Sequence, residues 1–388
     1  MSTKNGSKAK PTDSRFPTPI EQGTGNDGPI RIWEMPEPGP RSWLVDGFIP
    51  EGAITILYGD GGTGKSYLSL YLAIQALTGN DFLSRTVAQQ QAVLFIDAEL
   101  DDTEFRRRAY PVARGIGLNN LPVGMYYWSP QDSLTEKDVL TTVGRWLTKR
   151  EIGLVVIDSL TVAAGGTNVR DSEVITPLML GLKELGVTVV AVDHIKHRQL
   201  DTKESDYKPF GSVFKFNLAR SVIQVIKAEG GGLSLRQTKS NFGPLTESVR
   251  VAVRFEDDTI TFESLAATDP RLKGLEKQIP RHEAVHLTLK RMGPSTPQDL
   301  ADELGIDVKT VRNNLTKLRH QGQAEPLGDG RWCVPDSHSN SIGEPGLPQI
   351  EPSAAAGERK THDVSRKLKR VPGWIVDLVG TQRGLRPE

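Results

Sequence analysis

The stretch "AITILYGDGGTGKSYLSL" (53–70) decides the fold. Residues 59–66 fit the pattern G-x-x-x-x-G-K-[ST] at every fixed position. A β-branched apolar run precedes this pattern at 53–59, and a helical stretch follows it at 65–78. The glycines allow backbone N–H groups to wrap a phosphate, and the helix directs its positive end at the same anion. The stretch therefore predicts a phosphate-binding loop between a buried strand and a helix.

The chemistry expected of this loop is the binding of ATP with Mg²⁺. The Lys65 ammonium should reach the β- and γ-phosphates, and the Ser66 hydroxyl should ligate Mg²⁺. The other residues predicted to contact the nucleotide are Gly59, Asp60, Gly61, Gly62, Thr63, Gly64 and Tyr67.

Three further apolar runs, at 92–99, 153–160 and 187–194, have the same character as 53–59. Each is apolar on successive residues, as expected for strands that are buried on both faces. Helical segments such as 171–185 lie between them. This alternation predicts an α/β fold around a mostly parallel, twisted sheet. After residue 220 two strand–turn–strand patterns follow, and these should extend the sheet as antiparallel hairpins.

The chain has 388 residues, which is enough for two to three domains. Its 48 basic and 48 acidic residues balance, so any site for nucleic acid must be local. A single cysteine, Cys333, excludes an intrachain disulfide and fits a reducing cytoplasm. The sequence contains no readable signal peptide and no apolar run near the roughly 20 residues of a membrane span. We therefore expect a cytoplasmic protein with no membrane partner.

Changes in composition along the chain predict its domains. Polar ends rich in Gly, Pro and Ser enclose the patterned part. The last segment mixes basic and apolar residues, which leaves a docking peptide and a frayed tail both open. The predicted ranges are 1–28 for a disordered N-terminus, 29–268 for the ATPase core, 269–280 for a linker, 281–335 for a small helical domain, 336–362 for a flexible linker and 363–388 for the tail.

Acidic residues follow two of the predicted strands. Asp158 ends "LVVIDSL" and is the predicted Mg²⁺ ligand, because a P-loop site needs an acid at the end of a buried strand. Hydrolysis also needs a carboxylate that polarises the attacking water. "LFIDAEL" offers Asp97 and Glu99, and Glu99 lies further past the edge where nucleotides bind. We predict Glu99 as the catalytic base and a structural role for Asp97.

In this order, "GDGGTGKS", "FIDAEL" and "LVVIDSL" resemble the RecA-like P-loop ATPase core, in which the glutamate that ends the second strand is catalytic. AAA+ proteins instead place that glutamate beside the Walker B aspartate, whereas Ser159 follows Asp158 here. More narrowly, "SWLVDGFIPEGAITILYGDGGTGKS" is similar to the RepA-like branch of hexameric replicative helicases and related AAA-family ATPases. The resemblance covers about residues 41–265.

The resemblance implies further roles. His194, at the end of the fourth core strand, should sense the γ-phosphate. The polar loop 197–212 should face the channel of a ring, where single-stranded DNA passes, and an arginine finger should come from the neighbouring subunit. The finger candidates are Arg220 and Lys239, with ordinary hairpin charges as the alternative. The loop cations that could contact phosphate are Arg198, Lys203 and Lys208, with a solvated lid as the alternative, and Arg170, which could instead cap the following helix. The arginines of "FRRRAY" (105–110) are expected on a solvated helix face.

Residues 281–335 predict a winged helix-turn-helix: a helix at 281–292, two shorter helices and a hairpin. Thr296 and Asp307 are the expected N-caps, and Gly305 the expected helix end. The second helix of the pair should bury Val308, Val311, Leu315 and Leu318 and expose Lys309, Arg312, Lys317 and Arg319. Duplex DNA and a protein are both open as its partner.

The sequence therefore predicts an ATP-dependent DNA motor that forms a homo-oligomeric ring, expected to be a hexamer. Its role would be that of a replicative helicase or helicase loader. A recombination or repair ATPase and a DNA-binding regulator whose ATPase gates assembly are the alternatives.

Overall fold

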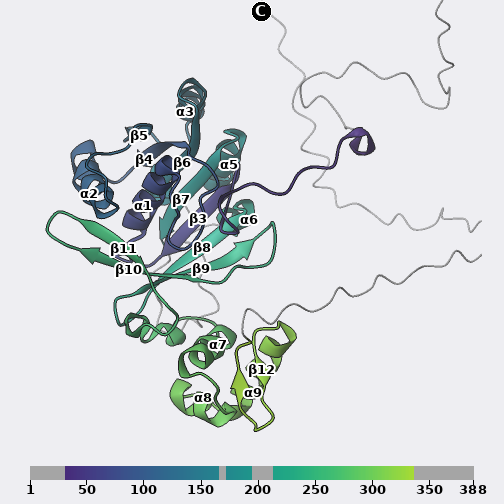
Figure 1. Cartoon of the computed structure of the whole chain (residues 1–388). Coiled ribbons are helices and arrows are strands. Elements are labelled where there is room, and N and C mark those ends of the chain that lie inside the picture. Colours follow the sequence, from purple (N-terminus) through teal and green to yellow (C-terminus); the bar gives the residue numbers. More distant parts are fainter. Residues whose placement is uncertain (1–30, 166–171, 195–212, 336–388) are drawn as a thin grey trace, which may run out of the picture. The chain divides into compact units, whose positions relative to one another are not determined.

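The computed structural model describes residues 31–165, 172–194 and 213–335. Its centre is a nine-stranded sheet in the order β11-β10-β9-β8-β3-β7-β6-β4-β5 (Figure 1). The six strands from β8 to β5 are parallel, and β9, β10 and β11 continue the sheet in antiparallel fashion. The predicted α/β fold with a mostly parallel sheet and antiparallel hairpins is confirmed. The bounds are β3 (Ile54–Gly59), β4 (Ala92–Asp97), β5 (Met125–Trp128), β6 (Ile152–Asp158), β7 (Thr188–His194), β8 (Ser221–Lys227), β9 (Leu233–Ser240), β10 (Val249–Phe255) and β11 (Ile260–Ser264).

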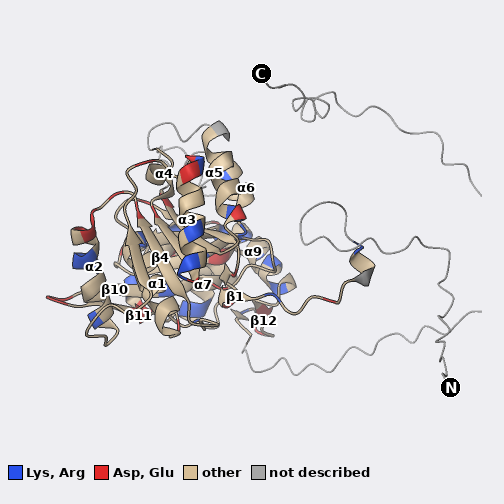
Figure 2. Ribbon diagram, turned by 90° about the horizontal axis from the view of Figure 1, so that it is seen from above, with Lys and Arg blue, Asp and Glu red and all other residues tan. Residues whose placement is uncertain are grey.

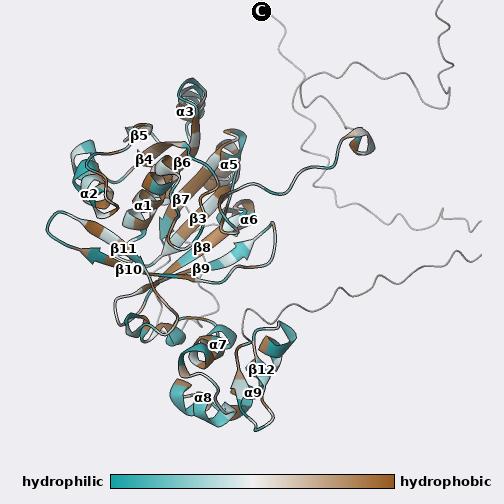
Figure 3. Cartoon of the chain, in the orientation of Figure 1, coloured by the Kyte–Doolittle hydropathy of each residue, from teal (hydrophilic) through white to brown (hydrophobic). Residues whose placement is uncertain are grey.

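Helices cover both faces of the parallel part of the sheet. Residues of α1 (Lys65–Thr78) and α2 (Asp102–Gly115) pack on one face against alternate residues of β4 and β6. Residues of α3 (Lys137–Lys149), α4 (Leu160–Ala163), α5 (Ser172–Glu184) and α6 (Val213–Leu218) pack on the other. The central strands are mostly hydrophobic (Figure 3), because both of their faces are buried.

Two short pieces precede β3. One turn of 3₁₀ helix, η1 (Ile32–Glu34), is followed by the two-stranded β1 (Trp43–Val45) and β2 (Ile49–Pro50). Phe48, between these two strands, is fully buried. Ser221 at the start of β8 donates a hydrogen bond to its carbonyl oxygen at 2.8 Å, which ties the hairpin to the sheet.

Residues 269–280, predicted as a linker, contain two 3₁₀ turns, η3 (Pro270–Leu272) and η4 (Leu275–Lys277). Leu272, Leu275 and Ile279 are buried in one apolar cluster with residues of β8 and β10. This connection is therefore packed along its length.

Residues 281–335 form three helices and a two-stranded hairpin. Thr296 makes a capping box with Asp299, Asp307 accepts from the Thr310 N–H, and Gly305 is left-handed with φ 62°. These three predicted helix ends are confirmed. Val311, Leu315 and Leu318 are buried and Val308 partly so. The elements are α7 (Arg281–Met292), α8 (Pro297–Leu304), α9 (Val308–His320), β12 (Glu325–Pro326) and β13 (Trp332–Cys333).

No helix in the described part of the chain is long and apolar enough to cross a membrane.

Candidate active site

The loop between β3 and α1 adopts the conformation of a phosphate cradle. Gly64 is the N-cap of α1 and has φ 81°, a left-handed conformation that a side chain would strain. A Cβ on Gly59 would lie 2.4 Å from the carbonyl oxygen of Val225 on β8, so only glycine lets the two strands pair here. Backbone conformation and strand packing therefore require glycine at these two positions, independently of any contact with a ligand.

Lys65 is the first residue of α1 and is buried. Its ammonium donates to the carbonyl oxygens of Gly59 at 3.0 Å and Asp60 at 2.7 Å, while the Thr63 hydroxyl donates to Asp60 at 2.9 Å. Burial lowers the pKa of Lys65, and the nearby Asp158 opposes that shift. The site thus holds a partly desolvated cation beside the cradle, where a phosphate would interact with it strongly.

Asp158 ends β6, directly beside the cradle. It is buried, and the Ser66 hydroxyl donates a hydrogen bond to it. Burial raises the pKa of Asp158 to about 6, and the nearby Glu99 and Asp97 act in the same direction. Three carboxylates thus share one region with a single buried ammonium.

This donor set fits Mg²⁺ with a phosphate. Within the described residues, no group of three or more His, Cys, Asp or Glu side chains could hold a metal by itself. Mg²⁺ is held in such sites by one or two protein oxygens together with substrate phosphates. Ser66 and Asp158 would supply the protein oxygens, and the bound ion would supply charge neutralisation to the phosphates.

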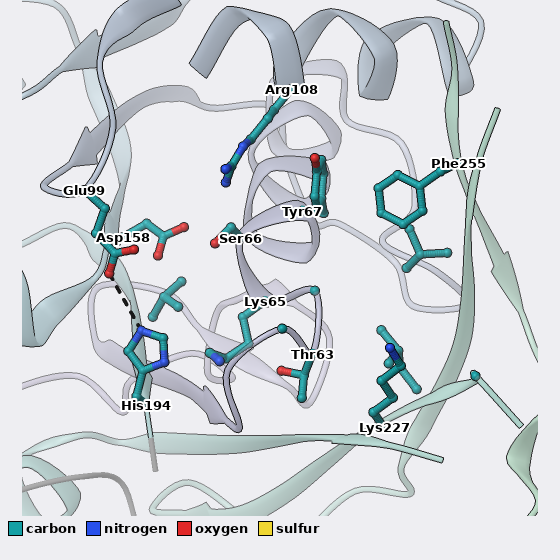
Figure 4. A pocket seen from close by; sticks show the side chains of 16 residues that line it. Thr63, Lys65, Ser66, Tyr67, Glu99, Arg108, Asp158, His194, Lys227 and Phe255 are labelled. Atoms are coloured by element: carbon teal, nitrogen blue, oxygen red, sulfur yellow. Dashed lines mark ion pairs between the residues drawn. The ribbon is translucent and has the colours of Figure 1, made fainter. Parts of the chain in front are cut away.

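Glu99 lies just beyond β4 and contacts residues at the ends of two neighbouring strands. The Ser159 hydroxyl, after β6, donates to its Oε1 at 2.5 Å. The His194 Nε2, at the end of β7, lies 3.7 Å from the same oxygen (Figure 4). The imidazole, and after it the Ser159 hydroxyl, holds the pKa of Glu99 below its usual range against the effect of burial. Glu99 is therefore ionised at neutral pH, as a general base must be.

Asp97 holds the turn on which Glu99 lies. Its Oδ1 accepts from the backbone N–H groups of Glu99 at 3.0 Å and Leu100 at 2.9 Å. It is buried, with 4% of its surface exposed. These contacts agree with the structural role that the sequence predicts for Asp97.

One pocket of about 380 Å³ is lined by Lys65, Ser66, Glu99, Asp158 and His194, and its far wall comes from the antiparallel part of the sheet. Phe255 of β10 is 61% exposed and meets the Tyr67 ring edge-on, with centroids 5.1 Å apart. Leu233 and Val253 lie beside it. The pocket therefore has a charged end, suited to phosphates, and an apolar end, suited to a planar base.

Two cations of this pocket were not predicted from the sequence. Arg108 extends from α2 toward the charged end, and Lys227 ends β8 (Figure 4). Arg106 and Arg107 do lie on a solvated face, paired with Asp102 and Glu104. Arg108 also pairs with Glu104, at 3.4 Å, but it is less exposed and follows buried Phe105 by three residues, so the spacing along the helix could have identified it. Nothing in the sequence around Lys227 marks it.

The two finger candidates lie at the opposite end of β3 from the cradle. The Arg220 N–H donates to Ile54 O at 2.8 Å, and Lys239 pairs with Val222. Arg220 lies level with Ile54, which is about 17 Å along β3 from Gly59. Lys239 lies level with Ile56, about 10 Å along the strand from Gly59. The Lys239 ammonium donates to three carbonyls at the end of α6, those of Phe216, Asn217 and Ala219, at 2.6–2.9 Å. The loop cations Arg170, Arg198, Lys203 and Lys208 lie outside the described residues.

Residues 31–199 match the family model described as an AAA domain. Among solved structures, the chain is similar to a KaiC-like protein of the hyperthermophilic archaeon Pyrococcus horikoshii. The identity is 17% and the TM-score 0.43, over 58% of this chain and 99% of that one. The search of curated proteins gave no match. The segment that matches this family model contains the P-loop between β3 and α1 and the acids at the ends of β4 and β6.

Proposed function

We propose that the chain is an ATP-driven motor on DNA, a RepA-like replicative helicase or helicase loader of a plasmid, phage or mobile element. The observation that carries the proposal is the convergence of three strand ends on one carboxylate. Glu99 after β4 is bound by Ser159 after β6 and by His194 at the end of β7. His194, the predicted sensor, contacts Glu99, the predicted base. Through this contact, hydrolysis can be coupled to the segment that follows His194 in the sequence.

The residues divide the chemistry as follows. Glu99 accepts the proton of the attacking water through its free carboxylate oxygen. Lys65 neutralises charge on the phosphates, and Ser66 with Asp158 would hold Mg²⁺. His194 reports on the γ-phosphate through its contact with Glu99.

Assembly into a ring is supported by the position of Arg220. Its backbone lies at the far end of β3 from its own cradle, and its side chain forms no ion pair with any described residue. Such a cation has no route to its own phosphates but can complete a neighbour's site. Lys239 is the weaker finger candidate, because its own chain already binds its ammonium.

Contact with DNA is supported by α9. The helix exposes Lys309, Arg312, Lys317 and Arg319, none of which is ion-paired within the described residues (Figure 2). We propose that α7–α9 with the β12–β13 hairpin act as a winged helix and that α9 is its recognition helix.

A strand-displacement assay on forked DNA tests the motor. We expect unwinding that requires ATP and Mg²⁺ and is lost when ATP is replaced by a non-hydrolysable analogue. ATPase activity that single-stranded DNA stimulates without any unwinding would favour the recombination or repair ATPase. ATPase activity that is indifferent to DNA would favour the regulator.

The recognition helix is tested by a Lys309→Glu/Arg312→Glu variant. We expect duplex DNA to bind about tenfold more weakly, with a salt dependence shallower by about two, because two phosphate contacts are lost. Fluorescence anisotropy across a salt series measures both quantities. Arg281→Glu, an exposed change on α7, is the matched control and should bind as the wild type does. Equal loss in both variants would argue against α9 as the recognition helix.

A further inference from the structure

A polar cluster with a fully buried ion pair lies on the face of the sheet opposite the pocket. The Lys215 ammonium donates to Asp193 Oδ2 and to Thr161 Oγ1, each at 3.0 Å. The Thr161 hydroxyl donates to Asp193 Oδ1 at 2.7 Å. Both charged side chains are 0% exposed. We call Thr161, Asp193 and Lys215 the buried triad.

The buried triad joins three elements that are far apart in the sequence. Thr161 belongs to α4, Asp193 to β7 and Lys215 to α6. Charges in an apolar interior are tolerated only when they are paired and hydrogen-bonded, so the three elements have one low-energy arrangement. The triad therefore fixes the ends of β6 and β7 relative to each other.

The two residues whose side chains contact Glu99, Ser159 and His194, lie within two positions of a triad member in the sequence. Successive residues of a strand point to opposite faces, so Asp193 points to the triad while His194 points to the pocket. Ser159 precedes Thr161 by two residues and is the N-cap of α4. A shift of the triad would thus move His194 and Ser159 relative to the carboxylate that they bind.

We propose that the buried triad is a set of positioning residues for ATP hydrolysis. It holds Ser159 and His194 in fixed positions relative to each other, and through their contacts it sets the orientation of the Glu99 carboxylate. The inference rests on the role of Glu99 in the proposed function. Because positional errors of about 1 Å at a reacting group can lower a rate by up to about 100-fold, a loosened triad should lower kcat without changing nucleotide affinity.

The test is Thr161→Val, which keeps the shape of the side chain and the ion pair but removes the hydroxyl that joins α4 to them. We expect kcat for ATP to fall about tenfold while KM and the Kd for a fluorescent ATP analogue stay within about twofold. Thr161→Ser restores the hydroxyl and should recover most of kcat. Thermal unfolding of each variant is measured in parallel.

Thr188→Val is the matched control. Thr188 is a buried threonine with 1% of its surface exposed, it lies at the other end of β7, and its hydroxyl accepts from Gly52 N at 3.1 Å. It should lower the unfolding temperature but leave kcat unchanged. Wild-type kcat in Thr161→Val would overturn the proposal, and so would equal losses of kcat in the two valine variants. The assay needs no DNA, so a negative strand-displacement result would leave its outcome unaffected.

Discussion

Glu99→Gln is expected to bind ATP as the wild type does and to lose about 100-fold or more in kcat. The amide keeps the size of the side chain and can still accept from Ser159, but it cannot take a proton from water. The phosphate contacts come from the loop after β3, so affinity should be retained. Steady-state phosphate release measures kcat, and equilibrium titration with a fluorescent ATP analogue measures binding.

Glu184→Gln provides the control for this change, because Glu184 is an exposed glutamate at the end of α5. It should hydrolyse ATP at the wild-type rate. A Glu99→Gln protein with normal turnover would refute Glu99 as the base.

Asp158→Asn should make the nucleotide-free protein more stable and nearly inactive. The pKa of Asp158 is raised by burial to about 6 from 3.8, so ionising this carboxyl costs stability as the pH rises through that interval. At pH 7–8 the full cost is present, and its removal should raise the free energy of unfolding by up to about 3 kcal/mol. Hydrolysis should fall about 100-fold or more, because the amide lacks the charge that holds Mg²⁺.

The pH dependence distinguishes this cause from better packing. Urea unfolding at several pH values should show a stability difference that shrinks as the pH falls from 7 and vanishes below about 4, where the wild-type carboxyl is protonated in both states. Asp138→Asn, an exposed change on α3, should show no such trend. A constant difference at all pH values would contradict ionisation as the cause.

The parts of the fold that the sequence predicts share a local signal. The β3 strand, the cradle and α1 follow from one continuous motif, and β4, β6 and β7 are apolar on successive residues because both of their faces are buried. β5 was not predicted: its four residues are all half-buried, since it lies at the edge of the sheet.

The residues that the sequence does not predict are placed by packing between elements that are distant in the sequence. Arg108 enters the pocket only because α2 packs with Phe105 against the sheet, and Phe255 enters it because β10 pairs with β9. Lys215 offers no local signal, since its two partners lie 22 and 54 residues away in the sequence. Lys239 is the opposite case. The sequence suggests an arginine-finger role, but the structure shows that the Lys239 ammonium already donates to backbone carbonyls of its own chain.

The antiparallel part of the sheet has a consequence for nucleotide choice. A base at the apolar end of the pocket would meet Leu233, Val253 and Phe255, all beyond the segment 31–199 that the family model matches, and Tyr67, which lies inside it. The P-loop and the acids after β4 and β6, which would act on the phosphates, all lie inside that segment. Under the proposed function, changes in β9 and β10 would therefore alter the choice of base while leaving the groups for hydrolysis in place.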